Sequence, residues 1–569
     1  MIGAVIAVVT RHAWIGFLLL SAGLGYLLVW ERGLYIDDYF FGVAPLNDPT
    51  LHGGLRPFAM LMLTSISRWV VDYELAIRVA QALLAVINAG LFGWLAYRLL
   101  RARWAGIAGA WLLALPLFAS EAILWTNAAL YPVAVLFMLL TLHAFYSLLH
   151  TATQQTSWGV VALVMFTISL LFHELVVIVP LLLPLLALIA AFGRPGARRR
   201  FPRYTLIVAT ALIAISGLVY LSLYNANAFV APRGSVNFSL TNLFQARIPT
   251  FLERLVWLTV GPEWGQGYFA EGFWLGAREL AATPTGVALL LITAVVLAAT
   301  VIMWPGRSGD LDAGIGVGVL VALLGVVWFL GGLLIPGVLV EAQILEYRML
   351  YVPFAGLILA ALALIWLILK ALNGTPAALL VERLALLAAG VIVIAAAVTT
   401  LGYARAYTAR ADLNTRQLTT FTRTFPDHVL PDELVLVPVG FDRTLFDQTP
   451  RINRLFFGVF DNRENLVAYL SAQYNYAGFT LIEGDYWWGV TLQTLPNGES
   501  VQIGPARTDL SLDDAEPLPL RQVLPITYRE GQMFAVRRWT PHDSETSIGF
   551  PVAADLSALG IPVIDLISD

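Results

Sequence analysis

Two adjacent carboxylates, Asp37 and Asp38, follow the first apolar stretch of the chain and precede a run of aromatic residues. Two such neighbours cannot both be stripped of water without raising the pKa of one of them. A carboxylate of that kind can act as a general base toward a hydroxyl group. The same pair can also cap a short helix at a membrane surface, and the pair taken alone favours this structural role.

Two further carboxylates stand in short apolar connections between hydrophobic stretches. Glu121 follows Phe-Ala-Ser, and Glu174 follows Leu-Leu-Phe-His. An acidic side chain at the edge of a bilayer is costly unless it is paired or faces a water-filled cavity. A structural ion pair and a role in a functional site therefore explain these two residues equally well.

Arg348 is the strongest candidate in the sequence for holding a phosphate group. Its guanidinium fork matches two phosphate oxygens at once, and Tyr351 can lie beside it at the membrane surface. The competing roles of Arg348 are an ion pair with Glu346 and extension toward the lipid headgroups.

Two more residues can supply positive charge. Arg56 can bind a phosphate group, or it can hold Asp37 or Asp38 by an ion pair and so orient the base. His173 is charged only when its imidazole ring is protonated. We therefore expect Arg348, Arg56 and His173 to bind an anion, with Glu121, Glu174, Glu346 and Tyr351 as supporting polar residues.

The composition shows what must position these residues. Hydrophobic residues make up 59% of the 569 and charged residues only 13%, and the mean hydropathy is +0.75. In soluble proteins, apolar residues make up about 45–50% and charged residues about 25%. The chain is therefore expected to be a polytopic α-helical membrane protein, with the lipid bilayer as a partner. A span needs about 20 apolar residues, and eleven such stretches occur, at 13–30, 76–97, 104–119, 129–149, 158–173, 175–192, 204–223, 285–303, 314–335, 352–369 and 383–402.

Basic residues in short loops predict the orientation of the spans. Alternate loops carry Arg98 to Arg103, Arg194 to Arg203, Arg307, and Lys370 with Arg383, and such loops are cytoplasmic. The first span has no small-residue cleavage site after it, so it is expected to be an uncleaved signal anchor with a cytoplasmic start. Residues after 402 are then expected to be extracytoplasmic. The protein as a whole is expected in the plasma membrane of a prokaryote.

The acidic residues sort to one side of this topology, which was set without them. All the carboxylates considered above fall on the outer side, whereas the inner loops hold only Asp310, Asp312 and Glu382. Longer outer loops explain part of this bias, above all between residues 224 and 284. We nevertheless expect the chemistry of this protein on its outer face.

Several classes of function are disfavoured. The net charge of -4 and the lack of a basic run longer than Arg198 to Arg200 argue against nucleic-acid binding. With no cysteine there are no thiolate metal sites and no disulfides. His143 and His150, seven residues apart, are expected to pack rather than to bind zinc. No cofactor is expected, and no metal site is assigned: a divalent metal remains possible but has no ligand set to support it.

The tail has a different composition from the rest of the chain. Apolar strand-like runs begin at Glu433 and at Phe479, with proline and glycine turns between them. Residues 403–424 are expected to form a polar helix that continues the last span. The division predicted is a transmembrane domain at 1–402 and a small exported α/β domain at 403–569, which is long enough for its own core.

Five segments between residues 13 and 400 form an ordered set of motifs. They are Tyr-Ile-Asp37-Asp38, Leu-Arg56-Pro57-Phe with Gln81 and Asn88 downstream, Ser-Glu121-Ala-Ile-Leu-Trp125, Phe-His173-Glu174, and Glu346-Tyr347-Arg348-Met-Leu-Tyr351-Val-Pro353. In this order they resemble motifs of the polytopic glycosyltransferases of the GT-C fold, above all the protein O-mannosyltransferase-like and tetratricopeptide-bearing branches. The chain lacks the 34-residue repeats of the latter branch. His173 stands where those proteins often have lysine, and Arg348 comes one place later than the arginine of their Glu-Arg motif.

The resemblance implies a reaction as well as a fold. Members of this family take a sugar from a polyprenyl phosphate and pass it to an acceptor hydroxyl, with inversion of the anomeric carbon and an outer-loop aspartate as the base. It thus implies catalytic roles for Asp37 and Asp38, a polyprenyl-phosphate sugar as donor, and a lipid, glycan or protein as acceptor.

Two other functions compete with this one. A transporter or a flippase for lipid-linked glycans also has charged residues among its spans, but it is expected to show internal repeats and charges near mid-span. A noncatalytic scaffold for the exported domain would leave Asp37, Glu121 and Glu174 without a purpose.

Overall fold

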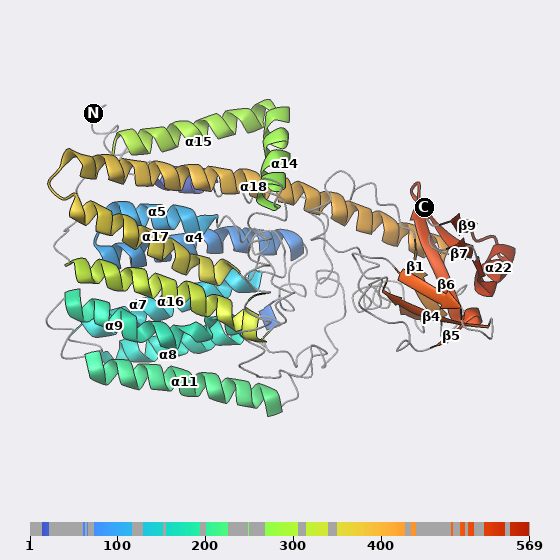
Figure 1. Cartoon of the computed structure of the whole chain (residues 1–569), viewed down its shortest axis with the longest axis horizontal. Helices are drawn as coiled ribbons and strands as arrows, with labels where there is room; N and C mark the ends of the chain where they lie inside the picture. Colours follow the sequence, from blue (N-terminus) through green and yellow to red (C-terminus); the bar gives the residue numbers. More distant parts are fainter. Residues whose placement is uncertain are drawn as a thin grey trace. The chain divides into compact units, whose positions relative to one another are not determined.

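The chain is a polytopic α-helical membrane protein with a small C-terminal domain that contains the strands (Figure 1). Two compact units divide the described residues, one ending at Ala404 and the other beginning at Arg405. The computed structural model describes residues 14–21, 58, 61–62, 65, 73–115, 129–151, 155–193, 201–225, 249, 268–304, 314–339, 350–426, 434–439, 479–481, 490–494, 499–505, 517–540 and 547–567.

Long helices that lie side by side form the first unit (Figure 1). Among the described residues, eight helices are long and apolar enough to cross a membrane: α4, α7, α8, α9 with the short 3-10 helix η3 before it, α15, α16, α17 and α18. The helices are α4 (Tyr73–Leu100), α5 (Arg103–Ala114), α7 (Leu130–His150), α8 (Gln155–Phe172), η3 (Glu174–Ile178), α9 (Val179–Gly193), α11 (Phe201–Asn225), α14 (Tyr268–Ala282), α15 (Pro284–Ile302), α16 (Ile315–Leu339), α17 (Tyr351–Ala371) and α18 (Pro376–Thr424).

The described residues of all eleven predicted spans are helical except at four span ends, which are Leu115, His173, Met303 and Gly314. Residues 14–21 represent the first predicted span, and α5 represents the third. The fifth and sixth spans are separate helices, because α8 ends at Phe172 and η3 begins at Glu174. Apolar length therefore predicts where helices form in this unit.

Glycines let α16 and α17 approach closely. Gly318, Gly325 and Gly332 recur every seven residues along α16, and a methyl group added to any of them would meet α17. At Gly325 it would lie 2.5 Å from the amide nitrogen of Ala360 and 2.6 Å from the carbonyl oxygen of Gly356. Small residues at such contacts are how helices pack where lipid gives no hydrophobic drive for association.

α14 differs from the membrane helices because one of its faces is polar. In Figure 1 it runs across α15 and α18 rather than along them. Gly276 of α14 and Gly402 of α18 lie so close to the opposite helix that a side chain on either would overlap its backbone, at Val398 and at Gly272 respectively. The exposed face carries Trp274, as is typical of helices that lie along a membrane surface.

The second unit contains a mixed sheet of order β2-β1-β6-β7-β8, with β9 also paired to β7. β1 runs parallel to β2 and β6, whereas β6 and β7 form an antiparallel hairpin whose turn has positive φ at Glu530 and Gly531. A small second sheet has the order β3-β4-β5. The elements are β1 (Leu434–Pro438), β2 (Phe479–Leu481), β3 (Val490–Thr494), β4 (Ser500–Pro505), β5 (Leu518–Pro519), η10 (Leu520–Gln522), β6 (Val523–Arg529), β7 (Gln532–Thr540), β8 (Ile548–Gly549), α22 (Pro551–Ala558) and β9 (Val563–Ile567).

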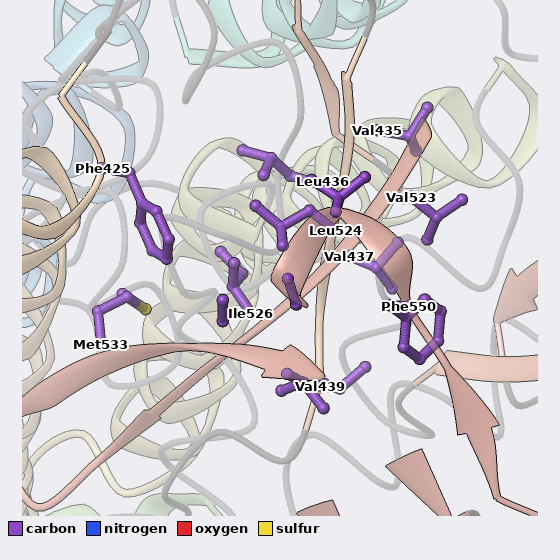
Figure 2. Packing of buried hydrophobic residues seen from close by; sticks show 14 of the residues in the cluster. Phe425, Val435, Leu436, Val437, Val439, Val523, Leu524, Ile526, Met533 and Phe550 are labelled. Carbon is purple, nitrogen blue, oxygen red and sulfur yellow. The ribbon is translucent and has the colours of Figure 1, made fainter. Parts of the chain in front are cut away.

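The end of α18 helps to form the core of this second unit. Phe421 and Phe425, the latter one residue beyond α18, are fully buried with ring centroids 5.3 Å apart, and they belong to the same cluster as residues of β1, β6 and α22. Figure 2 shows Phe425 with labelled residues of β1 and β6. The predicted strands at Leu434 and Phe479 and the predicted helix through residues 403–424 are confirmed. The predicted helix is polar in composition, but one face of its last turns is apolar and buried in the core of the second unit.

Candidate active site

Three of the predicted site residues lie in the described part of the chain, and each stands at the end of a helix. They are His173, Glu174 and Tyr351. The other predicted residues lie outside the described residues: Asp37, Asp38, Arg56, Glu121, Glu346 and Arg348.

His173 makes the connection between α8 and α9. Its backbone is extended, with φ -159° and ψ 134°, and its ring nitrogen Nδ1 accepts a hydrogen bond from the amide of Leu175 at 3.2 Å. This bond caps the start of η3 in the way that serine or aspartate caps other helices. The ring is 1% exposed and packs on the ring of Tyr131, with centroids 4.2 Å apart.

Glu174 competes for the same ring nitrogen. Its Oε2 atom lies 3.4 Å from Nδ1 of His173. An imidazole nitrogen that accepts a hydrogen bond from an amide has no hydrogen of its own, so it cannot at the same time donate a hydrogen bond to a carboxylate. Nδ1 of a neutral ring therefore accepts the hydrogen bond from the amide of Leu175, whereas a protonated ring would form an ion pair with Glu174.

Tyr351 begins α17, and its side chain is 1% exposed. Among the described residues, neither the Tyr351 hydroxyl nor the Oδ1 atom of Asn88, on α4, has a hydrogen-bond partner. The Nδ2 atom of Asn88 donates to the carbonyl oxygen of Pro132 at 2.8 Å, in the first turn of α7. One buried amide thus joins α4 to the start of α7.

These contacts gather segments that are far apart in the sequence. Tyr131, which packs on His173, directly precedes Pro132, which accepts from Asn88. Phe58, two residues after Arg56, packs edge to face with Phe172 at 6.0 Å. Three of the segments that resemble the GT-C motifs therefore have described residues in one neighbourhood, where α8 ends and where α7 and α17 begin.

Two glycines of α16 touch this neighbourhood from a further side. Gly331 lies against the side chain of Ile178 in η3. A methyl group on Gly332 would be 3.2 Å from the ring of Pro353, in the first turn of α17. Consecutive residues of one helix therefore contact both the turn that begins at His173 and the helix that begins at Tyr351.

Sequence reasoning missed two residues of this neighbourhood. Tyr131 has the pattern of an ordinary aromatic residue at a membrane boundary, and nothing in its spacing indicates a contact with His173. Ser169 is fully buried and donates to the carbonyl oxygen of Ala134 at 2.7 Å, which joins α8 to α7. A serine inside an apolar helix was the available signal, since such hydroxyls often bond to a neighbouring helix.

The two histidines of α7 have packing roles at the other end of the helices. His143 bonds through Nε2 to the carbonyl oxygen of Leu91 at 2.9 Å, and Arg98 contacts its Nδ1 at 3.2 Å. His150 contacts the carbonyl oxygen of Tyr146 at 2.8 Å. Within the described residues, no three histidine, aspartate or glutamate side chains are grouped to hold a metal ion.

No family model matches the sequence, and no curated protein matches it either. Among solved structures, two crystal structures of ArnT from Cupriavidus metallidurans are similar. With undecaprenyl phosphate bound, it is 14% identical at a TM-score of 0.32, over 82% of this chain and 90% of that one. In the apo state it is 15% identical at a TM-score of 0.31, over 77% of this chain and 84% of that one. Similarity at this level shows neither a shared site nor a shared reaction.

Proposed function

We propose that this protein is a membrane glycosyltransferase that moves a sugar from a polyprenyl phosphate to an acceptor hydroxyl at its extracytoplasmic face. The observation that supports it best is the gathering of three motif segments at one set of helix ends. Phe58 represents the first segment, His173 with Glu174 the second, and Tyr351 the third. A membrane-embedded enzyme with a lipid-linked substrate needs its polar groups where helices end, because charges inside the bilayer are costly.

The proposed reaction forms one carbon–oxygen bond and breaks another. Asp37 takes the proton of the acceptor hydroxyl while the oxygen attacks the anomeric carbon in line. The bond from that carbon to the phosphate oxygen breaks, so the configuration inverts and polyprenyl phosphate leaves with the electron pair. Asp38 orients Asp37 or the acceptor. Arg348 and Arg56 balance the negative charge that collects on the leaving phosphate.

The remaining predicted residues, described or not, have supporting roles in this proposal. Because Nδ1 of His173 is bonded to the backbone, His173 shapes the turn that presents Glu174, and Arg348 carries most of the phosphate binding. Tyr351 fixes the start of α17, three residues after Arg348. Glu121 and Glu346 are further acidic partners for the cations of the site. No step in this scheme requires a metal or a cofactor.

The proposed reaction needs the C-terminal domain and the site to be extracytoplasmic. The arginines between Arg194 and Arg203 motivate this orientation. We expect alkaline phosphatase fused after Asp569 to be active in a bacterial host, because that enzyme matures only outside the cytoplasm. Green fluorescent protein folds well only in the cytoplasm, so the same protein fused after Asp569 should not fluoresce. The opposite pattern would contradict the eleven-span topology.

The activity itself can be tested with purified protein and a panel of radiolabelled polyprenyl-phosphate sugars. We expect one of these donors to transfer its sugar to a membrane acceptor, with polyprenyl phosphate as the second product. Arg348→Lys should raise the KM for that donor, because an ammonium group keeps the charge and loses the two-pronged geometry. An unchanged KM for the donor in Arg348→Ala would contradict phosphate binding by this arginine. Movement of the lipid across the bilayer without sugar transfer would support the flippase instead.

A further inference from the structure

Arg98, in the last turn of α4, has its charged group fixed in place by side chains of α4 and α7. Its Cζ atom lies 5.0 Å from the ring centroid of Trp94 and 4.4 Å from that of Tyr146. A cation over an aromatic face is attracted by the ring. The Nη2 atom of Arg98 donates to the hydroxyl group of Ser147 at 3.2 Å, and Nη1 donates to Nδ1 of His143 at 3.2 Å. The guanidinium group is thus held on its faces and along its edge.

His143 is neutral in this arrangement. Because its Nδ1 atom accepts a hydrogen bond from Arg98, the ring hydrogen is on Nε2, which donates to the carbonyl oxygen of Leu91 at 2.9 Å. The ring of His143 also stacks on the ring of Trp94, with centroids 4.4 Å apart. His143 therefore orients Arg98 without adding a charge.

The residues around Arg98 lie at the edge of the membrane-spanning part of α4. Trp94 is 51% exposed and Tyr97 is 42% exposed, and Arg98 is partly exposed beside them. The apolar length of α4 ends two residues later, at Leu100. Exposed tryptophan and tyrosine side chains are typical of the level of the lipid headgroups. Arg98 is therefore within reach of those headgroups.

The charge at this end of α4 and α7 is positive. Arg101 and Arg103 follow Arg98 in the turn to α5, and the sequence has no aspartate or glutamate from 75 to 120 or from 122 to 173. A lipid phosphate has the complementary charge, and a guanidinium group can bind two of its oxygens. The same arginines predict that this end is cytoplasmic, and the cytoplasmic leaflet is the one that carries anionic lipids.

We propose that Arg98, with Trp94 and Tyr97, forms a binding site for the headgroup of an anionic phospholipid at the predicted cytoplasmic end of α4. The guanidinium group binds the phosphate, and the exposed rings contact the lipid next to its headgroup. Because the guanidinium group is already fixed, little side-chain entropy is lost when the lipid binds. This site goes beyond the proposed sugar transfer and lies at the end of α7, whereas the candidate active site lies at its start.

Phosphatidylglycerol and phosphatidylcholine with the same acyl chains test the proposal, because both contain a phosphate group but only the first has a net charge. Each lipid is added to the purified full-length protein in detergent, and its affinity is read from the concentration that gives half of the rise in Tm. We expect phosphatidylglycerol to stabilise the wild type more. Arg98→Gln should weaken its affinity about fivefold, the effect of one basic residue at an anionic surface.

Arg383→Gln is the matched control, because it removes the same charge from another partly buried arginine at the same predicted side. Arg383 donates to the carbonyl oxygens of Ile302 and Trp304, past the end of α15, at 3.1 and 3.4 Å. This variant should lower the Tm and leave the affinity for phosphatidylglycerol unchanged. A wild type that phosphatidylglycerol stabilises no more than phosphatidylcholine would overturn the proposal. Equal affinities in Arg98→Gln and Arg383→Gln would do so too.

Two further variants separate lipid binding from a role of Arg98 that is limited to joining α4 and α7. Arg98→Lys keeps the charge, so it should retain more affinity than Arg98→Gln, and an equal loss in both would show the joining role alone. If Arg98→Gln yields no folded protein, Trp94→Leu replaces it in the comparison with Arg383→Gln. Its exposed leucine remains apolar, and the lost ring contact should weaken the affinity about two- to fivefold.

Polyprenyl phosphate is the last comparison, because it is also an anionic lipid. If Arg98→Gln loses stabilisation by polyprenyl phosphate and keeps stabilisation by phosphatidylglycerol, Arg98 binds the donor lipid and the proposal is wrong. None of these measurements depends on sugar transfer. Failure of the proposed function therefore leaves the lipid site standing, and failure of the lipid site leaves the proposed function standing.

Discussion

Asp37→Asn should abolish sugar transfer, with a loss of about a hundredfold or more, because general-base catalysis usually contributes a factor of this size. An amide has nearly the same size and shape as a carboxylate but cannot take a proton. Expression and donor binding should therefore be unchanged. The measurement is the rate of radiolabelled sugar transfer, with the Tm shift caused by polyprenyl phosphate as the check on binding.

Asp38→Asn is the matched comparison, since it changes the neighbouring residue in the same chemical way. Its loss of activity should be smaller if Asp38 only orients Asp37 or the acceptor. A larger loss in Asp38→Asn than in Asp37→Asn would exchange the two roles. Full activity in the variant that carries both substitutions would refute the proposed mechanism.

Gly325→Leu should prevent α16 and α17 from packing together. A Cβ atom at residue 325 would lie 2.5 Å from a backbone nitrogen and 2.6 Å from a backbone oxygen of α17, and backbone cannot move aside as a side chain can. We expect a destabilisation of about 3 kcal/mol or more, at or above the top of the usual range for overpacking. The Tm in detergent should fall by roughly 10 °C, or no monodisperse protein should be obtained.

Gly316→Leu is the control on the same helix. A Cβ atom at Gly316 would meet nothing within 4 Å, and the residue is exposed on the surface of α16. Leucine favours a helix by nearly 1 kcal/mol relative to glycine, so this variant should be neutral or slightly more stable. A Gly325→Leu protein with the Tm of Gly316→Leu would show that α16 and α17 do not pack as described.

The sequence predicts the helical elements well because membrane spans are defined by a single local property. A run such as residues 352–369 has enough apolar residues to cross the hydrocarbon layer, and α17 covers it from Tyr351 to Ala371. The strand at Leu434 is also predicted correctly, from a short apolar run between turn residues. The apolar stripe at the end of α18 was missed, although Phe421 and Phe425 are four residues apart and so share one helix face.

The contacts of the candidate site are harder to predict than its elements. Hydropathy places His173 at a helix end, but it does not show that Nδ1 bonds to the amide of Leu175. The resemblance marks Asn88 as part of a motif, but the partners of a buried amide depend on which helices are neighbours. In a bundle where nearly every face is apolar, the sequence pattern contains little information about neighbours.

In the proposed enzyme, Gly331 and Gly332 would have a consequence for which donors are accepted. Because these two residues have no side chains, the separation between η3 and α17 is set by the main chain of α16. Side-chain substitutions elsewhere around η3 and α17 would then leave this separation unchanged. In the proposed enzyme, the phosphate would be the constant part of the substrate and the sugar the part free to diverge among related proteins.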